Sequence, residues 1–114
     1  MPGCLFCNIV AGKTPAEIVF DSDHVLAFKD IRPAAPVHAL VIPKVHIPGI
    51  HEATPEHAAA LGQVLLAARD VAEKLGLASG GYRLVVNQGA DAGQSVFHLH
   101  CHVLGGRSLA WPPG

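Results

Sequence analysis

Residues 97–104 read FHLHCHVL, a run in which histidine alternates with apolar residues. Successive side chains of a β-strand point to opposite faces of the sheet, so this period of two predicts a strand with His98, His100 and His102 on one face. The opposite face would carry the apolar members of the run, namely Phe97, Leu99, Cys101 and Val103. A strand with one apolar face needs a packed layer behind it, so we expect a β-sheet with a hydrophobic core.

Other apolar runs predict the rest of this sheet. The expected strands, in chain order, are residues 17–21, 25–29, 38–42, 82–87 and 96–104. The first two are separated only by Ser22, Asp23 and His24, which is typical of a β-hairpin. The third ends at Pro43, because proline cannot donate to a strand ladder. Together they indicate about five strands in a mainly antiparallel sheet.

Two helices are expected. Residues 5–11 carry apolar side chains at helical spacing and stop at Gly12, which predicts a short N-terminal helix. A long helix should begin at Thr54 and Pro55 and end at Gly76, because threonine caps free N–H groups and proline suits the first helical position. Its buried face is expected to contain Leu61, Val64, Leu65, Ala68, Ala72 and Leu75. The fold class is therefore α+β, with this helix on one face of the sheet and the other face open to a ligand.

Size and charge exclude several classes of protein. With 114 residues, of which 50% are hydrophobic and 15% charged, the chain is expected to form one domain over residues 1–114. A net charge of -1 supplies no basic field for a polynucleotide. The apolar runs are too short to cross a membrane and the N-terminus lacks the features of a secretory signal, so we expect a cytoplasmic protein with no membrane partner.

The three alternating histidines support two kinds of chemistry. A His-x-His pair can supply two zinc ligands, but at ~3.3 Å per residue the backbones of His98 and His102 would lie roughly 13 Å apart, so three rings cannot share one ion. Alternatively, a neutral imidazole attacks phosphorus when an acceptor holds the proton of its other nitrogen. His100 is best placed for this, because the histidines on both sides of it can bind phosphate oxygens.

Two shorter motifs add to this interpretation. Residues 93–95, Gly-Gln-Ser, offer backbone N–H groups to an anion and a hydroxyl to a leaving group, although an ordinary hairpin loop fits them equally well. Cys4 and Cys7 form a Cys-x-x-Cys motif, which in a reducing compartment indicates a metal site or a redox pair before a structural disulfide. Redox motifs of the thioredoxin kind begin a helix within a βαβ pattern, which is not found here, so we favour the metal site.

The spacing of His98, His100 and His102, with apolar residues between and after them, resembles the signature of the histidine triad (HIT) superfamily of nucleotide hydrolases and transferases. The surrounding sequence resembles the Hint branch, the histidine triad nucleotide-binding proteins. The segments that carry this likeness are FKDI at 28–31, HALVIPKVHI at 38–47, VVN at 85–87, GQS at 93–95, LGGR at 104–107 and WPPG at 111–114. The resemblance extends from about residue 5 to the last residue. Three histidines outside it, His24, His51 and His57, are expected at the surface.

The resemblance implies a role for each site residue. His100 would be the nucleophile that forms a covalent nucleotidyl-histidine intermediate, with His102 and His38 around the phosphate and Ser95 assisting the leaving group. The implied substrate-binding residues are Phe6, Ile9, Phe28 and Ile31 at the purine base, Asp30 at the ribose hydroxyls, and Asn87, Gly93 and Gln94 at the phosphate. Without the resemblance, the apolar members of this set would be interpreted as core residues and Asp30 as a turn residue.

The resemblance also implies a metal. Several bacterial HIT proteins complete a Cys-x-x-Cys pair with the histidine after the Pro-Lys turn and the first histidine of the triad, which here are His46 and His98. The result would be a closed, structural Cys₂His₂ zinc site formed by Cys4, Cys7, His46 and His98. Such a site would attach the N-terminal helix to the sheet and fix the ring of His98. No organic cofactor is implied.

The expected activity is that of a purine nucleoside phosphoramidate hydrolase, which cleaves a P–N bond and releases a nucleoside monophosphate and an amine. A dinucleoside polyphosphate hydrolase, and a nucleotide-binding interaction module with incidental hydrolysis, are the alternatives. Similar proteins are homodimers in which two sheets join edge to edge into ten strands, with the C-terminal tail reaching toward the partner's site. We therefore expect a homodimer.

Overall fold

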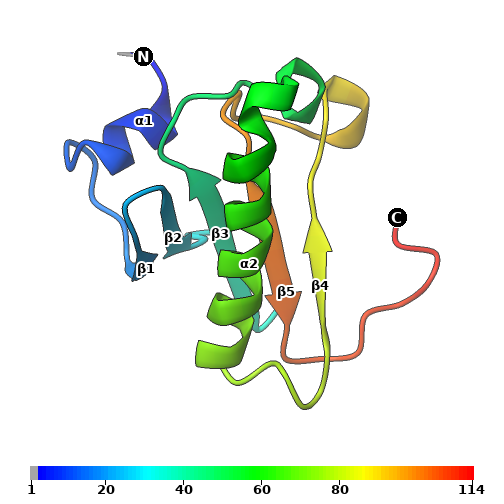
Figure 1. Ribbon diagram of the computed structural model, residues 1–114. Coiled ribbons are helices and arrows are strands. Elements are labelled where there is room, and N and C mark those ends of the chain that lie inside the picture. The colour runs from blue at the N-terminus through cyan, green and yellow to red at the C-terminus, as the bar shows by residue number, and fades with distance from the viewer. Residues whose placement is uncertain (1–2) are drawn as a thin grey trace.

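The structure, a computed structural model, describes residues 3–114 (Figure 1). Within this range the helices are α1 (Leu5–Val10) and α2 (Ala58–Lys74), and the strands are β1 (Ile18–Asp21), β2 (Val25–Lys29), β3 (Val37–Pro43), β4 (Tyr82–Val85) and β5 (Cys101–Gly105). Short 3-10 turns cover Ile50–Glu52, Pro55–His57 and Ala90–Ala92. The expected α+β class, with one long helix and a short N-terminal helix, is confirmed.

The strands form one sheet in the order β1-β2-β3-β5-β4, and every neighbouring pair is antiparallel. The predicted hairpin is present as β1 and β2. Farther along the sheet, β5 lies between β3 and β4, with His102 opposite Leu40 and Leu104 opposite His38. This register brings His38 and His102 together from distant parts of the sequence.

The two faces of the sheet bury different side chains, because neighbours along a strand alternate. Toward α2, which lies across the sheet in Figure 1, the strands contribute Val19, Val25, Ala27, Ala39, Val41, Cys101 and Val103. On the opposite face, Leu26, Phe28, Leu40 and Ile42 pack with Phe6 of α1. His102 belongs to this second face, since both of its neighbours in β5 point toward α2. The helix therefore covers one face and leaves the other to α1 and the histidines.

The long helix begins as predicted. Thr54 forms a capping box with His57, in which the backbone N–H of Thr54 donates to Nδ1 of His57 at 3.0 Å, and Pro55 occupies the first turn. Gly76, with φ of 79°, follows its C-terminal end. The buried face consists of Val64, Ala67, Ala68, Val71 and Ala72. The prediction for Leu65 is wrong, since its side chain is 53% exposed; it lies about 100° around the helix from the stripe that the small alanines hold against the sheet.

The histidine run is a strand only in its second half. β5 begins at Cys101, which pairs with Val41, and residues 96–100 are not in strand conformation, contrary to the prediction. The ladder stops here because β3 is about to end at Pro43, which has no N–H to donate. Phe97, expected in the core, is 58% exposed.

Among the described residues, no helix has both the length and the apolar character needed to cross a membrane.

Candidate functional site

The segment before β5 is held by individual hydrogen bonds in place of a strand ladder. Nε2 of His98 lies 2.8 Å from the carbonyl oxygen of Pro43, and the backbone N–H of Leu99 donates to that of Ile47 at 2.6 Å. Because these contacts tie residues 98 and 99 to the chain just after β3, the first two histidines of the triad have fixed positions although they lie outside the sheet. His98 is fully buried and His100 is 7% exposed.

A hydrogen bond to the main chain fixes the tautomer of His100. Its Nδ1 lies 2.7 Å from the carbonyl oxygen of His98. A carbonyl only accepts, so Nδ1 carries the proton and, in the neutral ring, Nε2 keeps the lone pair. The ring also makes an edge contact with Phe6, at 5.1 Å between centroids. The hydrogen bond therefore orients the His100 ring and, in its neutral form, leaves the lone pair on Nε2.

A second chain of contacts orients His102. The backbone N–H of Ala34 donates to Nδ1 of His38 at 3.0 Å, so the proton of the neutral His38 ring is on Nε2. That nitrogen lies 2.8 Å from Nδ1 of His102, which must accept, and the proton of His102 is therefore on Nε2. Asp30 Oδ2 lies farther from His38 Nε2, at 3.4 Å. The His38–His102 contact is consequently the stronger hydrogen bond.

Burial keeps these two rings neutral. Desolvation, followed by the nearby charges of His100 and His38, lowers the pKa of His102 to about 4, against an opposing effect of Asp30. Burial also lowers the pKa of His38, and Asp30 again opposes the shift. Near neutral pH, His102 is therefore a neutral donor through Nε2, and the contact between His38 and Asp30 is not an ion pair.

These side chains border a pocket of about 350 Å³ on the face opposite α2. Of the residues expected to bind substrate, those that line it are Phe6, Ile9, Phe28, Asp30, Ile31, Ser95, His100 and His102. Phe28 is both a core residue and a wall of the pocket, and Asp30 serves both the pocket and a turn, because its Oδ1 accepts from the N–H of Arg32 at 2.8 Å. Ile31 is 91% exposed and forms an open rim. Residues 14–16 also line the pocket, and nothing in their sequence indicated it.

Three expected phosphate-side residues, Asn87, Gly93 and Gln94, are not among the lining residues. The N–H groups of Gly93 and Gln94 donate within their own loop, to Ala90 and Gly89, at 3.0 Å each. The Gln94 side chain is buried, accepting from the N–H of Gly89 at 2.9 Å and donating to the carbonyl of Pro48 at 2.9 Å. Sequence reasoning missed this role of Gln94, which is to hold the loop that carries Ser95.

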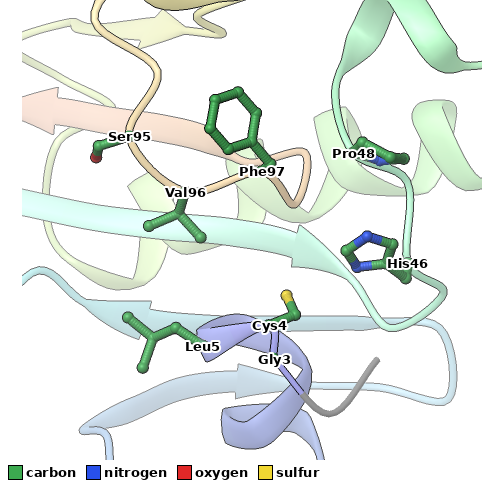
Figure 2. Close-up of a pocket in the computed structure, with 8 residues that line it drawn as sticks. All are labelled: Gly3, Cys4, Leu5, His46, Pro48, Ser95, Val96 and Phe97. Atoms are coloured by element: carbon green, nitrogen blue, oxygen red, sulfur yellow. The ribbon is translucent and has the colours of Figure 1, made fainter.

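A second pocket, of about 460 Å³, lies beside the first (Figure 2). It is lined by Gly3, Cys4, Leu5, His46, Pro48, Ser95, Val96 and Phe97. Leu5, Ser95 and Val96 line both pockets, which therefore adjoin along these three residues.

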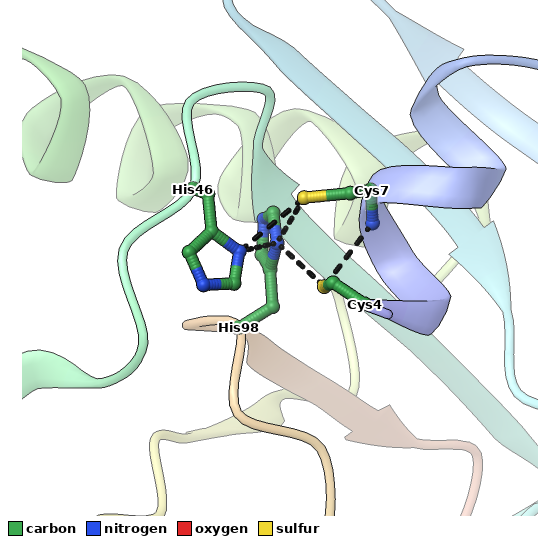
Figure 3. A group of neighbouring side chains, drawn as sticks. All are labelled: Cys4, Cys7, His46 and His98. Atoms are coloured by element: carbon green, nitrogen blue, oxygen red, sulfur yellow. Dashed lines mark hydrogen bonds between the residues drawn. The ribbon is translucent and has the colours of Figure 1, made fainter. Parts of the chain in front are cut away.

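Two cysteines and two histidines gather at the start of α1 (Figure 3). Nδ1 of His98 lies 3.4 Å from Sγ of Cys4, 3.5 Å from Sγ of Cys7 and 3.2 Å from Nδ1 of His46. Sγ of Cys7 lies 3.3 Å from the same nitrogen of His46. Since Nε2 of His98 donates to Pro43, its Nδ1 has the lone pair that faces the cluster.

These distances suit a tetrahedral zinc ion. With Zn–N of about 2.0–2.1 Å and Zn–S of about 2.3 Å, neighbouring ligand atoms should be roughly 3.3–3.8 Å apart. Burial and the neighbouring Cys4 raise the pKa of Cys7, and a bound cation would oppose this shift by stabilising the thiolate. The donor set and its spacing therefore fit zinc in a closed, structural site.

Comparisons with known proteins agree with this geometry. Residues 11–109 match the HIT domain family. A HIT-like protein of Synechocystis sp., described as uncharacterized, is 53% identical over 110 residues, which are 96% of each chain. A HIT family hydrolase from Legionella pneumophila superposes with a TM-score of 0.96 at 47% identity, covering 98% of this chain and 100% of that one. A histidine triad nucleotide-binding protein from Candida albicans has a TM-score of 0.82 at 29% identity, covering 96% and 83%.

Proposed function

The chain belongs to the HIT domain family, and from this premise we propose that it is a purine nucleoside phosphoramidate hydrolase. The observation that carries the proposal is the state of His100, which lines the pocket with its Nδ1 proton engaged by the His98 carbonyl and its Nε2 lone pair available. A nucleophile at phosphorus requires this arrangement, because the bonded N–H stabilises the imidazolium that forms.

In the first step, Nε2 of His100 attacks phosphorus and the P–N bond breaks. The leaving nitrogen takes a proton from the hydroxyl of Ser95, which lines the pocket, and departs as the amine. Nε2–H of His102 donates to a phosphate oxygen and stabilises the charge that develops there. The product of this step is a nucleotidyl group on His100.

In the second step, water attacks the phosphorus of this intermediate. Its hydroxyl joins phosphorus, its second proton returns to Ser95, and the P–N bond to His100 breaks with the electron pair returning to Nε2. The net reaction consumes one water and releases a nucleoside monophosphate and an amine. The neutral His100 ring and the serine hydroxyl are both restored.

The nucleoside is assigned to the remaining walls of the pocket. Phe6 and Phe28, in edge contact at 5.3 Å between centroids, form with Ile9 an apolar slot for the purine ring, and Ile31 covers its rim. Asp30 lies beside the His38–His102 pair and is placed to accept from the ribose hydroxyls. The polar side chains of the pocket are thus assigned to the sugar and the phosphate, and its apolar side chains to the base.

Intact-mass measurement after an acid quench tests the proposal. With an adenosine phosphoramidate, the wild-type protein should gain the mass of one nucleotidyl group, whereas His100→Ala should show no adduct and lose turnover by about 10⁴-fold or more while still binding the monophosphate. His24→Ala, a substitution in the exposed β1–β2 turn, is the matched control and should behave as wild type. Full turnover in His100→Ala would overturn the mechanism. Nucleotide binding without adduct or turnover in the wild type would indicate a binding module instead.

We further propose that Cys4, Cys7, His46 and His98 hold a structural zinc ion. The four ligand atoms lie within 4.8 Å of one another, and Nδ1 of His98 is oriented toward the sulfurs. The ion would supply fixed geometry, since the four protein ligands leave no open position for substrate. Thiolate ligation requires reduced cysteines, which accords with the cytoplasmic location expected from the sequence.

The expected homodimer is retained as a proposal, and strand β4 supports it. β4 is an edge strand, in which Tyr82 and Leu84 are each 36% exposed. Leu84 pairs with Val103 and Tyr82 with Gly105, so these two side chains point to the α2 side of the sheet, but α2 packs mainly over β2, β3 and β5. A second copy added edge to edge at β4 would cover this apolar strip and continue the sheet to ten strands.

A further inference from the structure

We propose that the second pocket, in Figure 2, is a leaving-group subsite that selects amines with an apolar, uncharged substituent, and that Phe97 is its main specificity determinant. This inference rests on the proposed function, because it assigns the part of the substrate beyond the P–N bond. The nucleoside pocket accounts for the base, the sugar and the phosphate, and leaves the amine unplaced.

A series of direct contacts connects Asp30 with His46 through the site. His38 lies 3.4 Å from Asp30 and 2.8 Å from His102, whose ring centroid is 5.0 Å from that of His100. On the other side, His100 bonds the carbonyl of His98 at 2.7 Å, and His98 lies 3.2 Å from His46. The contacts therefore run in order from the carboxylate assigned to the ribose, through the proposed nucleophile, to His46.

The second pocket lies at the His46 end of this series of contacts, because His46 is one of its lining residues. Ser95 and Val96 line both pockets, so the hydroxyl that serves the leaving nitrogen stands where the two meet. A substrate with its ribose at Asp30 and its phosphorus at His100 thus extends past Ser95 into the second pocket. The substituent on the leaving amine is the group that reaches it.

The lining determines which substituents fit. The nucleoside pocket contains Lys29, Asp30 and Arg32, whereas the second pocket has no aspartate, glutamate, lysine or arginine. Its largest apolar side chains are Leu5 and Phe97, which are 48% and 58% exposed and can bury surface against a ligand. Figure 2 shows the Phe97 ring standing above Val96 on the loop that leads from Ser95. An aromatic or aliphatic substituent gains contact here, while a carboxylate would find no lysine or arginine to pair with.

Two substrates separate this subsite from the chemistry. Adenosine 5′-phosphoramidate with an unsubstituted amine reports the nucleotidyl transfer alone, and its N-phenethyl derivative adds a group that should occupy the second pocket. Phe97→Ala should raise KM for the phenethyl substrate about tenfold, the change expected from losing ~50 Å² of apolar contact, and leave kcat/KM for the unsubstituted substrate within about twofold. Phe97→Leu should retain most of the preference.

Leu66→Ala is the matched control, because Leu66 is similarly exposed, at 53%, but lies on α2 across the sheet. Leu66→Ala should leave KM and kcat/KM unchanged for both substrates. Equal effects of Phe97→Ala on both substrates, or none on either, would overturn the subsite while the proposed hydrolase stands. Failure of the wild type to hydrolyse even the unsubstituted phosphoramidate would instead refute the proposed function, and the subsite with it.

Discussion

The backbone N–H of Ala34 determines which nitrogen of His102 carries a proton, although it acts only through His38 and does not contact the His102 ring. It donates to His38, which must then donate to His102. A backbone group cannot titrate, so this tautomer is set by the fold at all pH values where both rings are neutral. The orientation of His100 has the same origin, since its acceptor is a backbone carbonyl.

Acidification should destabilise the protein through His102. Burial, with the charges of His100 and His38, lowers the pKa of His102 from 6.5 to about 4. Between pH 6.5 and 4, His102 is therefore protonated in the unfolded chain but neutral in the folded protein. The stabilising effect is complete above pH 6.5 and is lost as the pH falls toward 4. Discounted for the partial exposure of the ring, this amounts to about 1 kcal/mol between pH 7.5 and 5.5.

Urea unfolding at both pH values measures this effect. Between pH 7.5 and 5.5 the unfolding free energy of the wild type should fall by about 1 kcal/mol more than that of His102→Gln, because glutamine has no proton to gain. A difference that is the same at both pH values would show that His102 is not held neutral by the fold.

Among single residues, sequence reasoning succeeded where a ladder sets the direction of the side chain. It placed His102 on the face opposite Cys101 and Val103, and the structure confirms this. It failed for Phe97, because a period of two gives direction only while the chain remains a strand. The role of Gln94 depends on carbonyls of residues far away in the sequence, which no local pattern reveals.

At the scale of elements, α1 is short and is attached mainly at its start. It has six residues, and the side chain of Cys4 accepts from the N–H of Cys7 at its first turn. Phe6 is its one fully buried residue. An isolated helix of this length is not stable in water, so its position depends on the Cys/His cluster and on the packing of Phe6.

Removing the proposed zinc ligands should therefore release α1. Protein purified without added metal should contain about one zinc per chain, and Cys4→Ser with Cys7→Ser should contain almost none and melt at a lower temperature. A chelator should lower the melting temperature more than it lowers turnover, because the ion is structural. Cys101→Ala, which removes a buried thiol outside the cluster, should keep its zinc. Zinc well below one per chain, unaffected by the cysteine substitutions, would refute the site.

The elements themselves were largely predictable. Both helices and the first three strands have strong local signals, namely a threonine cap, glycine stops and a terminal proline. The structure departs from their expected limits by a residue or two, except that a 3-10 turn at Pro55–His57 forms the expected first turn of α2. The exception is the stretch before β5. Whether it pairs depends on where the neighbouring strand ends, which is a property of two segments more than fifty residues apart.

At the scale of the whole molecule, the sheet separates the main hydrophobic core from the candidate functional site. Its α2 face holds a continuous apolar core, and its other face holds the triad histidines and both pockets. The arrangement leaves β4 with an apolar strip on the α2 side that this chain's helix does not cover. The register of β4 against β5 could not be read from composition or periodicity, because it is fixed by the tertiary pairing.

Leu84→Asp tests the proposed dimer. Light scattering on a sizing column should give the wild type twice its chain mass of 11.9 kDa, and the variant the mass of one chain, because a carboxylate would be buried at the shared edge. Ile18→Asp places the same charge on β1, the opposite edge of the sheet, at a side chain that is 45% exposed, and should remain dimeric. A wild type that elutes as one chain at micromolar concentration would contradict the proposal.

Residue 98 contributes to the two centres through different atoms. Its ring belongs to the Cys/His cluster, whereas its main-chain carbonyl accepts a hydrogen bond from His100, the proposed nucleophile. Every amino acid has that carbonyl, so a substitution of His98 would disturb the Cys/His cluster and the contact with Pro43 but would keep the acceptor for His100, provided that the local backbone keeps its path. The three histidines are therefore not equivalent under substitution: replacing the first removes a ligand from the proposed zinc site, whereas replacing the central one removes the proposed nucleophile itself.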